Sequence, residues 1–147
     1  MTEKVGLAYN DVGYKFTTGT RMVTPGDLDI CAAASGERDP AFLSDEVARA
    51  AGLKARIIPV AMMLAVKDGL IGEYVEGALF LGMNNVKWQT TPYPYDTFRV
   101  EGELLNKRET SKGDRFIITY LWAVKNQDDA TIAQGESTEM FAKPKDL

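Results

Sequence analysis

The strongest constraint on the fold is a change of sequence pattern at Gly77. The longest helical pattern lies before it; it opens at Pro59 and continues through 60–75, apolar on nearly all sides, so we expect most of this helix to be buried. After Gly77 come four segments rich in β-branched and aromatic residues, separated by turns, which predict four strands. These strands are expected over 78–89, 97–106, 115–126 and 130–141. The third is apolar on both faces, which predicts a central strand.

Shorter elements precede the long helix. Residues 12–23 predict a short strand or hairpin arm, and a capping box begins a helix at Thr24. A loop is expected over 36–43, followed by a second short helix over 45–51. Helices segregated to one side of an antiparallel sheet define an α+β fold. One long apolar helix wrapped by such a sheet is the hot-dog architecture.

Length and composition are those of a single globular domain spanning 1–147, with 45% apolar residues. A net charge of −4 without a basic stripe argues against nucleic-acid binding. No apolar run is long enough to span a bilayer, and the polar N-terminus lacks the apolar core of a signal peptide. Cys31 is the only cysteine, so we expect no intrachain disulfide and a cytoplasmic protein.

The absence of histidine limits the chemistry open to this chain. It excludes Ser-His-Asp and Cys-His nucleophilic systems, the HExxH zinc site and any imidazole acid or base. One cysteine and no histidine leave almost nothing to bind a structural zinc, so we expect no metal and no cofactor. Acid–base chemistry must come from Asp, Glu, Tyr, Lys or Cys31.

Three stretches carry a resemblance that covers nearly the whole chain. They are 12–37 (VGYKFTTGTRMVTPGDLDICAAASGE), 90–97 (TTPYPYDT) and 124–137 (VKNQDDATIAQGES). Their residues, order and spacing resemble the motifs of the MaoC-like hydratases, the family that includes the R-specific enoyl-CoA hydratases and 3-hydroxyacyl dehydratases. The resemblance implies a hot-dog fold and an acyl thioester substrate, carried by CoA or by acyl carrier protein. A diverged pocket could instead accept a free small molecule.

The segment that resembles the active-site signature of that family, S-x-D-x-N-P-x-H-x-D, is 35–44. Glu37 stands at the catalytic Asp, and Asp39 stands at the Asn. Phe42 replaces the catalytic His, and Ser44 replaces the second Asp. The resemblance therefore implies that the usual Asp/His activation of water does not operate unchanged. It makes Glu37 the candidate acid–base, supported by Asp39, with Phe42 lining the same cavity and excluding water.

In the family, a glycine N–H at the start of the central helix polarises the thioester carbonyl. The matching residue here is Val60 or Ala61, and neither is glycine. Their backbone N–H groups remain, and a helix N-terminus favours developing negative charge, although a Cβ crowds the approach. Met62 suits an adaptable acyl tunnel. Tyr93 and Tyr95, in the turn that resembles the family's, are candidates for the pocket rim.

Each candidate also has a purely structural interpretation. Glu37 and Asp39 are typical loop and helix-cap residues. Met62 could simply fill the core. Asp68, within the long helix, is expected to pair with Lys67, with Lys54 or with a partner subunit. It also stands where some hot-dog thioesterases keep the carboxylate that directs water at the thioester.

Three functions stay open at this point. The first is hydration, dehydration or a related elimination on an acyl thioester, with a carboxylate in place of the Asp/His pair. The second is a non-catalytic subunit of a heteromeric MaoC-like hydratase, and the third is a hot-dog thioesterase. Because open sheet edges and an apolar helix face need cover, we expect a homodimer or a heteromer with a related hot-dog subunit.

Overall fold

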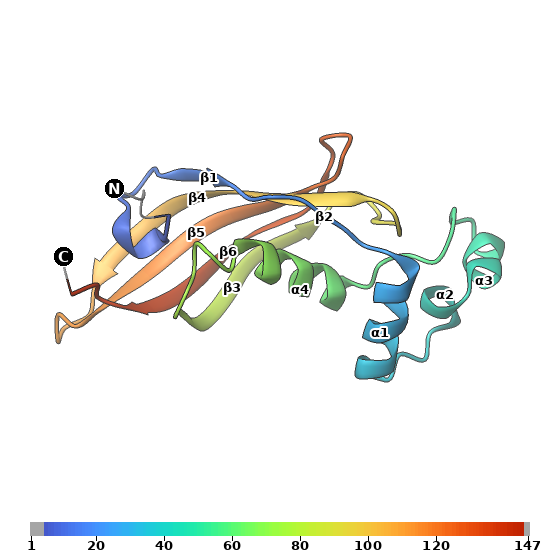
Figure 1. The fold of residues 1–147 in the computed structure, drawn as a ribbon, viewed down its shortest axis with the longest axis horizontal. Coiled ribbons are helices and arrows are strands. Elements are labelled where there is room, and N and C mark those ends of the chain that lie inside the picture. The colour runs from blue at the N-terminus through green and yellow to red at the C-terminus, as the bar shows by residue number, and fades with distance from the viewer. Residues whose placement is uncertain (1–4, 146–147) are drawn as a thin grey trace.

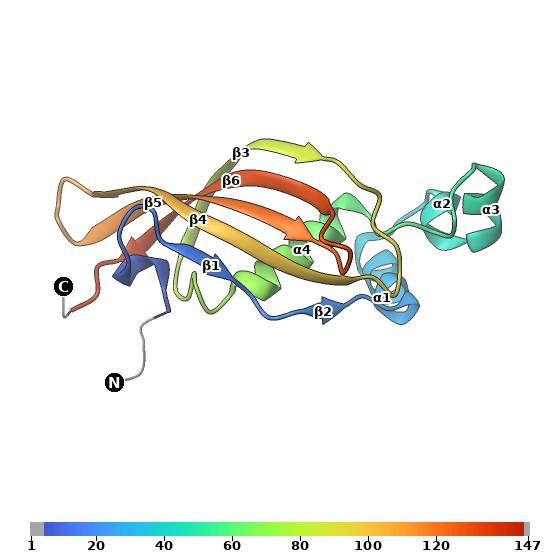
Figure 2. The same ribbon diagram turned by 90° about the horizontal axis from the view of Figure 1, so that it is seen from above.

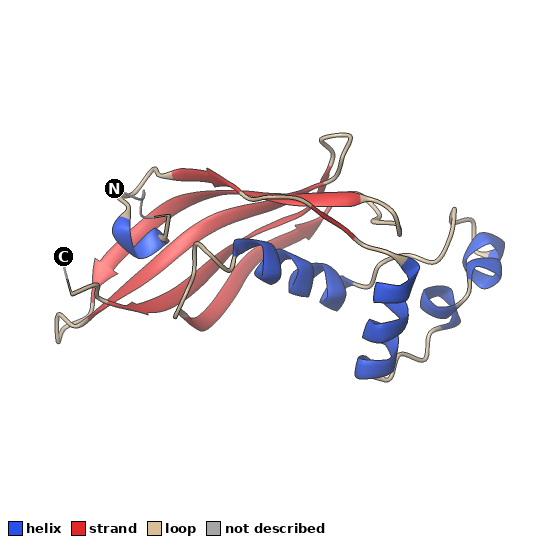
Figure 3. Ribbon diagram, viewed as in Figure 1, coloured by secondary structure: helices blue, strands red, loops and turns tan. Residues whose placement is uncertain are grey.

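The structure is a computed structural model that describes residues 5–145, so both ends of the predicted domain lie outside the described residues. A curved antiparallel sheet carries one helix along one of its faces, and three shorter helices lie beyond one end of the sheet (Figures 1 and 3). Figure 2 shows the sheet from above, with the long helix running beneath it. The predicted α+β hot-dog fold is confirmed.

The sheet is built mainly from the second half of the chain. Its four long strands are β3 (Leu79–Trp88), β4 (Thr97–Glu109), β5 (Arg115–Lys125) and β6 (Thr131–Ala142). The strand order is β1-β4-β5-β6-β3, and neighbouring strands pair antiparallel. β5 lies between β4 and β6, as its apolar character on both faces predicts.

Two short strands lie at the other edge of the sheet. β1 (Lys15–Thr17) and β2 (Arg21–Met22) both pair with β4, after a short 3-10 helix, η1 (Leu7–Tyr9). They do not pair with each other, so the alternative of a hairpin arm over 12–23 is wrong. This segment instead extends along β4 and leads into the helical part of the chain.

Three short helices form the part of the molecule beyond the sheet. They are α1 (Pro25–Ser35), α2 (Pro40–Leu43) and α3 (Asp45–Ala50). The predicted capping box at Thr24 is present, and a left-handed Gly36 ends α1. Helix α2 falls within the predicted loop over 36–43 and corrects it. It forms because the Asp39 side chain accepts a hydrogen bond from the Ala41 N–H, and Pro40 suits a first helical position.

The central helix is α4 (Val60–Ile71), which begins directly after Pro59 as predicted. It ends four residues before the apolar pattern does, because Gly69 and Gly72 are weak helix formers. The prediction that most of the helix is buried is only half right. One face packs on the sheet and the other is open, with Val60 52% exposed.

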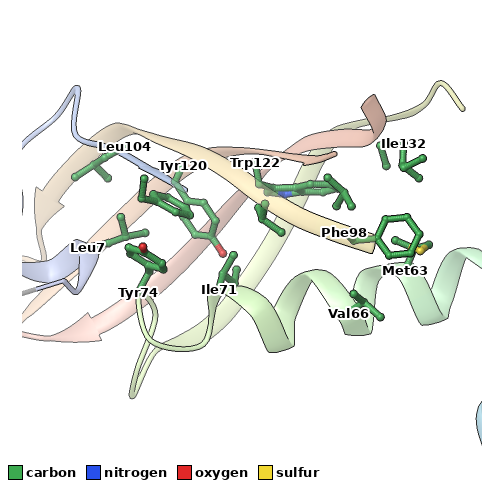
Figure 4. Close-up of a cluster of buried hydrophobic side chains, with 14 of the residues drawn as sticks. Leu7, Met63, Val66, Ile71, Tyr74, Phe98, Leu104, Tyr120, Trp122 and Ile132 are labelled. Carbon is green, nitrogen blue, oxygen red and sulfur yellow. The ribbon is translucent and has the colours of Figure 1, made fainter. Parts of the chain in front are cut away.

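The core lies between α4 and the sheet (Figure 4). Large side chains from β4, β5 and the inner face of α4 meet there, including Met63, Phe98, Tyr120 and Trp122, each 1% exposed or less. The layer fixes α4 against the sheet. As a result, the N-terminal end of α4 points toward the three short helices.

Strand β3 is irregular along its length. Its pairing with β6 shifts register between Phe80 and Gly82 and again between Asn84 and Lys87, and each shift leaves one extra residue in β3, Leu81 and Asn85. Asn85 has a φ of 54°, a left-handed conformation that asparagine tolerates better than most residues. These are β-bulges, which bend an edge strand and increase its twist.

Candidate functional site

A mostly apolar pocket of about 260 Å³ lies at the N-terminal end of α4. Helix α2 contributes Phe42, and the start of α4 contributes Val60. The remaining walls come from Ile57 and Ile58, before α4, and from 88–92, after β3. The structure thus brings together two of the predicted substrate-binding residues, Phe42 and Val60, although they are 18 positions apart in the sequence.

Hydrogen bonds hold the loop before α4 against the turn after β3. The Ile58 N–H donates to the Pro92 carbonyl at 3.0 Å, and the Lys54 N–H donates to Tyr93 Oη at 3.4 Å. Ile58 and Pro92 are both buried. The pocket is therefore a defined feature of the fold and not a gap between mobile loops.

The start of α4 offers hydrogen-bond donors at the pocket. Pro59 is the N-cap and provides no side-chain cap, and the first intrahelical bond runs from the Met63 N–H to the Pro59 carbonyl. Among residues 5–145, the N–H groups of Val60 and Ala61 have no hydrogen-bond acceptor. These donors and the positive end of the helix dipole suit a carbonyl oxygen that gains negative charge.

The two predicted catalytic carboxylates lie in the loop between α1 and α2. Glu37 Oε1 accepts hydrogen bonds from the N–H groups of Arg38 and Asp39, both at 2.9 Å. Asp39 is exposed and caps α2 through Ala41. Both therefore fill the structural roles that loop carboxylates usually fill. Among the described residues, Glu37 Oε2 accepts no hydrogen bond, and neither carboxylate is among the residues that line the pocket of Phe42 and Val60.

The other predicted binding residues are divided between separate surfaces. Ala61 and Met62 line a groove of about 450 Å³ between α1 and α4, together with Cys31. Met62 is only 7% exposed, so it also fills the core, which was the structural alternative to a place in an acyl tunnel. Tyr93 lines a more polar hollow that adjoins the apolar pocket along 89–91. Tyr95 is 68% exposed and belongs to neither of these two hollows.

A buried polar cluster between α4 and the sheet was not predicted as such. Tyr120 Oη donates to Glu139 Oε1 at 2.6 Å, and both side chains are buried. Lys67 is fully buried, with its Nζ 2.6 Å from Asp68 Oδ1 and 5.0 Å from the centroid of the Trp122 ring. Of the three partners expected for Asp68, the structure shows Lys67. Nevertheless, the Lys67 ammonium meets no group of the described chain in hydrogen-bond geometry.

Burial governs the titration of this cluster. It raises the pKa of Glu139, while the Tyr120 hydroxyl and the Lys67 charge oppose that rise. Burial also raises the pKa of Tyr120, and the neighbouring Glu139 adds to the effect. The sequence does contain a signal for Glu139. It lies two positions before Phe141 in β6, and residues two positions apart in a strand point to the same face, here the inward one.

Two further kinds of feature, a metal-binding cluster and a membrane-spanning helix, are absent from the described residues. Between residues 5 and 145, no three Cys, Asp or Glu side chains come together in a way that could hold a metal ion. None of the helices in this range is long and apolar enough to cross a membrane.

Comparisons with known proteins bear on the fold. No family model matches the chain, and no curated protein matches it. Among solved structures, it is similar to the unliganded R-hydratase PhaJ1 from Pseudomonas aeruginosa, with 25% identity over 96% of this chain and 88% of that one (TM-score 0.78). A MaoC-like dehydratase from Rhodospirillum rubrum is 22% identical over 95% and 98% of the two chains (TM-score 0.79).

A third similar structure is the (3R)-hydroxyacyl-ACP dehydratase complex HadBC from Mycobacterium tuberculosis. It is 17% identical over 89% of this chain and 98% of that one, with a TM-score of 0.74. These likenesses establish the fold, and the resemblance to the MaoC-like hot-dog family is confirmed.

Proposed function

We propose that the protein binds an acyl thioester at the N-terminal end of α4 and catalyses its hydration, dehydration or a related elimination. The observation that supports this most directly is the pocket of Phe42 and Val60, where an apolar wall adjoins the free N–H groups that begin α4. An acyl thioester matches both features, because it pairs an apolar chain with a carbonyl that becomes more negative during enolisation. The three similar structures are hydratases and dehydratases by name, which agrees with this choice.

Glu37 is the residue proposed to move the proton. Its Oε1 is held by the loop backbone, while Oε2 remains free among the described residues. A carboxylate whose position is fixed through one oxygen can accept a proton on the other. Asp39 supports the arrangement by capping α2, the helix that carries Phe42. Because no imidazole assists, crotonyl-CoA hydration should be about 10²–10⁴-fold slower than with an Asp/His pair.

Binding is tested first, by calorimetric titration of the purified protein with crotonyl-CoA and octanoyl-CoA. The informative variant is Val60→Asp, because aspartate in the first helical turn is well tolerated and leaves α4 folded. Its carboxylate competes for the free N–H groups and repels a developing oxyanion, so we expect at least tenfold weaker binding. Val47→Asp is the matched control, since Val47 is 42% exposed and lies in the first turn of α3, outside the pocket lining.

Chemistry is tested with Glu37→Gln, which keeps the shape and the Oε1 hydrogen bonds but removes the titrating group. Hydration of the bound enoyl thioester should fall at least tenfold while the thermal midpoint holds. Failure of both thioesters to bind the unmodified protein refutes the proposed substrate class. Full turnover by Glu37→Gln, with an unchanged pH profile, refutes the role of Glu37.

A second candidate function is that of a non-catalytic subunit. Two observations favour it: both carboxylates already accept backbone hydrogen bonds within their own segment, and Phe42 stands where the family has its histidine. HadBC, named as a complex, shows that such folds occur in assemblies. Acyl-thioester binding without turnover, together with turnover once a hot-dog partner carrying the complete signature is added, supports this alternative.

The thioesterase alternative is less compatible with the geometry. Asp68 lies eight residues beyond Val60, about 12 Å along the helix axis at the usual rise per residue. Its carboxylate also pairs with the buried Lys67 at the inner side of α4. A carboxylate so placed is far from a thioester bound at the start of α4. Release of free CoA that depends on Asp68 would reverse this conclusion.

A further inference from the structure

Arg56 connects the segment that carries the candidate catalytic residues to the wall of the pocket. It lies in the loop between α3 and α4, directly before Ile57 and Ile58, which line the pocket. Its side chain is only 12% exposed, which is unusual for arginine outside a functional or structural contact. We infer that Arg56 is a positioning residue for the proposed acyl-thioester site, an inference that rests on the function proposed above.

The Arg56 side chain binds α1 through two different nitrogen atoms. Nη1 donates to Asp29 Oδ1 at 2.6 Å, and Nη2 donates to the Pro25 carbonyl at 3.1 Å. A planar guanidinium presents its donors in a fixed fork, so two simultaneous bonds define orientation as well as distance. The loop before α4 is therefore fixed relative to α1.

The Arg56 backbone binds α3. Its N–H donates to Asp45 Oδ1 at 2.9 Å, and Asp45 is the first residue of α3. One residue thus contacts the helix before and the helix after the segment 36–44. That segment contains Glu37, Asp39 and Phe42. Asp45 directly follows this segment, whereas the contacts on α1 lie near the start of that helix, at Pro25 and Asp29, so α1 itself transmits the constraint to Glu37.

The alternative connections across this region are weaker. Arg49 Nε donates to the Lys54 carbonyl at 3.1 Å, which ties α3 to the start of the same loop but does not reach α1. No element of the sheet covers the outer side of the three short helices (Figure 1). Leu28 anchors α1 in the core by hydrophobic packing. The Arg56 contacts add the polar link that joins α1 to the loop before α4.

The experiment compares Arg56→Gln with the unmodified protein by two measurements. The first is amide hydrogen exchange of Ile58, whose N–H bonds the Pro92 carbonyl, with the amides of β5 as the measure of global stability. The second is the dissociation constant for octanoyl-CoA. We expect exchange at Ile58 to accelerate and octanoyl-CoA binding to weaken, each at least tenfold, while β5 exchange stays unchanged.

Two further variants make the result specific. Arg56→Lys keeps the charge and can hold Asp29 but not the Pro25 carbonyl as well, so binding should stay at least threefold weaker than in the unmodified protein. Arg115→Gln removes an exposed arginine at the far end of β5 and should change neither measurement. Complete recovery with lysine refutes the two-bond arrangement.

The inference fails if Ile58 exchange is unchanged in Arg56→Gln, or if exchange in β5 accelerates in parallel, since Arg56 would then act on global stability alone. Its failure is distinguishable from failure of the proposed function. If the unmodified protein binds no octanoyl-CoA, the substrate class is wrong, but Ile58 exchange still tests whether Arg56 fixes the pocket wall.

Discussion

Lys67 is the most unusual charged residue of the core, and its replacement by methionine is expected to stabilise the protein. Its side chain is fully buried on the sheet-facing side of α4, and among the described residues its ammonium has no partner in hydrogen-bond geometry. Methionine keeps the length and flexibility of the aliphatic stem but removes the charge. Its thioether also makes favourable contacts with an aromatic ring, which Trp122 supplies.

The size of the effect follows from three opposing contributions. Removing an ammonium from water costs several kcal/mol, even after relaxation of the protein. The Trp122 ring, with its centroid 5.0 Å from the ammonium, returns about 2 kcal/mol. Asp68, 65% exposed and therefore screened by solvent, returns about 0–1 kcal/mol. The net gain in the free energy of unfolding for Lys67→Met is about 1–2 kcal/mol, which raises the melting temperature of a chain of about 150 residues by about 2–8 °C.

Urea and thermal denaturation followed by circular dichroism measure this gain, with Lys87→Met as the control, because Lys87 is exposed on β3. The control should shift the melting temperature little in either direction. Lys67 also lowers the pKa of Glu139, so its removal favours protonated Glu139 and the gain should be largest at mildly acidic pH. A loss of stability in Lys67→Met at every pH would refute the reasoning, because it would mean that the buried ammonium is fully compensated in the folded state.

Three other outcomes can be tested in the same way. Burial raises the pKa of Glu139 above its ordinary value of 4.5, so the folded protein holds this proton more tightly than the unfolded chain does. The free energy of unfolding should therefore fall as the pH rises from 4.5 through the folded pKa. In urea titrations at several pH values, Glu139→Gln should flatten that fall. Gly102→Ala should lower the free energy of unfolding by about 1–3 kcal/mol or prevent folding, because the new Cβ would overlap the Phe16 ring. A variant as stable as the unmodified protein would contradict the close packing of Phe16 on Gly102. Glu37→Asp combined with Phe42→His should raise crotonyl-CoA hydration at least tenfold, and no increase would argue against the alignment with the family signature.

Most of the fold was predictable because its signals are local. The four long strands follow from apolar alternation and turn residues, and the position of β5 follows from its apolar character on both faces. The start of α1 follows from the capping box at Thr24. In contrast, α2 was missed because four residues are too few for a periodic pattern, and only the Asp39 cap and Pro40 indicate it.

The site was less predictable because it is assembled by tertiary contacts. Phe42 and Val60 line one pocket together with 88–92, and the Ile58–Pro92 hydrogen bond joins the loop before α4 to the turn after β3. No sequence spacing encodes that bond. The separation of Val60 from Ala61 has a local origin. Adjacent residues project from different sides of a helix, so these two line different hollows.

The two extra residues of β3 also affect how the protein behaves when it is concentrated. Among the described strands, β3 pairs only with β6, and its outer edge carries free N–H and C=O groups beside the exposed Leu79 and Phe80. A straight edge of this kind can recruit strands from other molecules and grow into fibrils. The bulges at Leu81 and Asn85 divide that edge into short runs, so an incoming strand cannot match it over its full length. The irregular backbone of β3 therefore disfavours edge-to-edge association when the protein is concentrated.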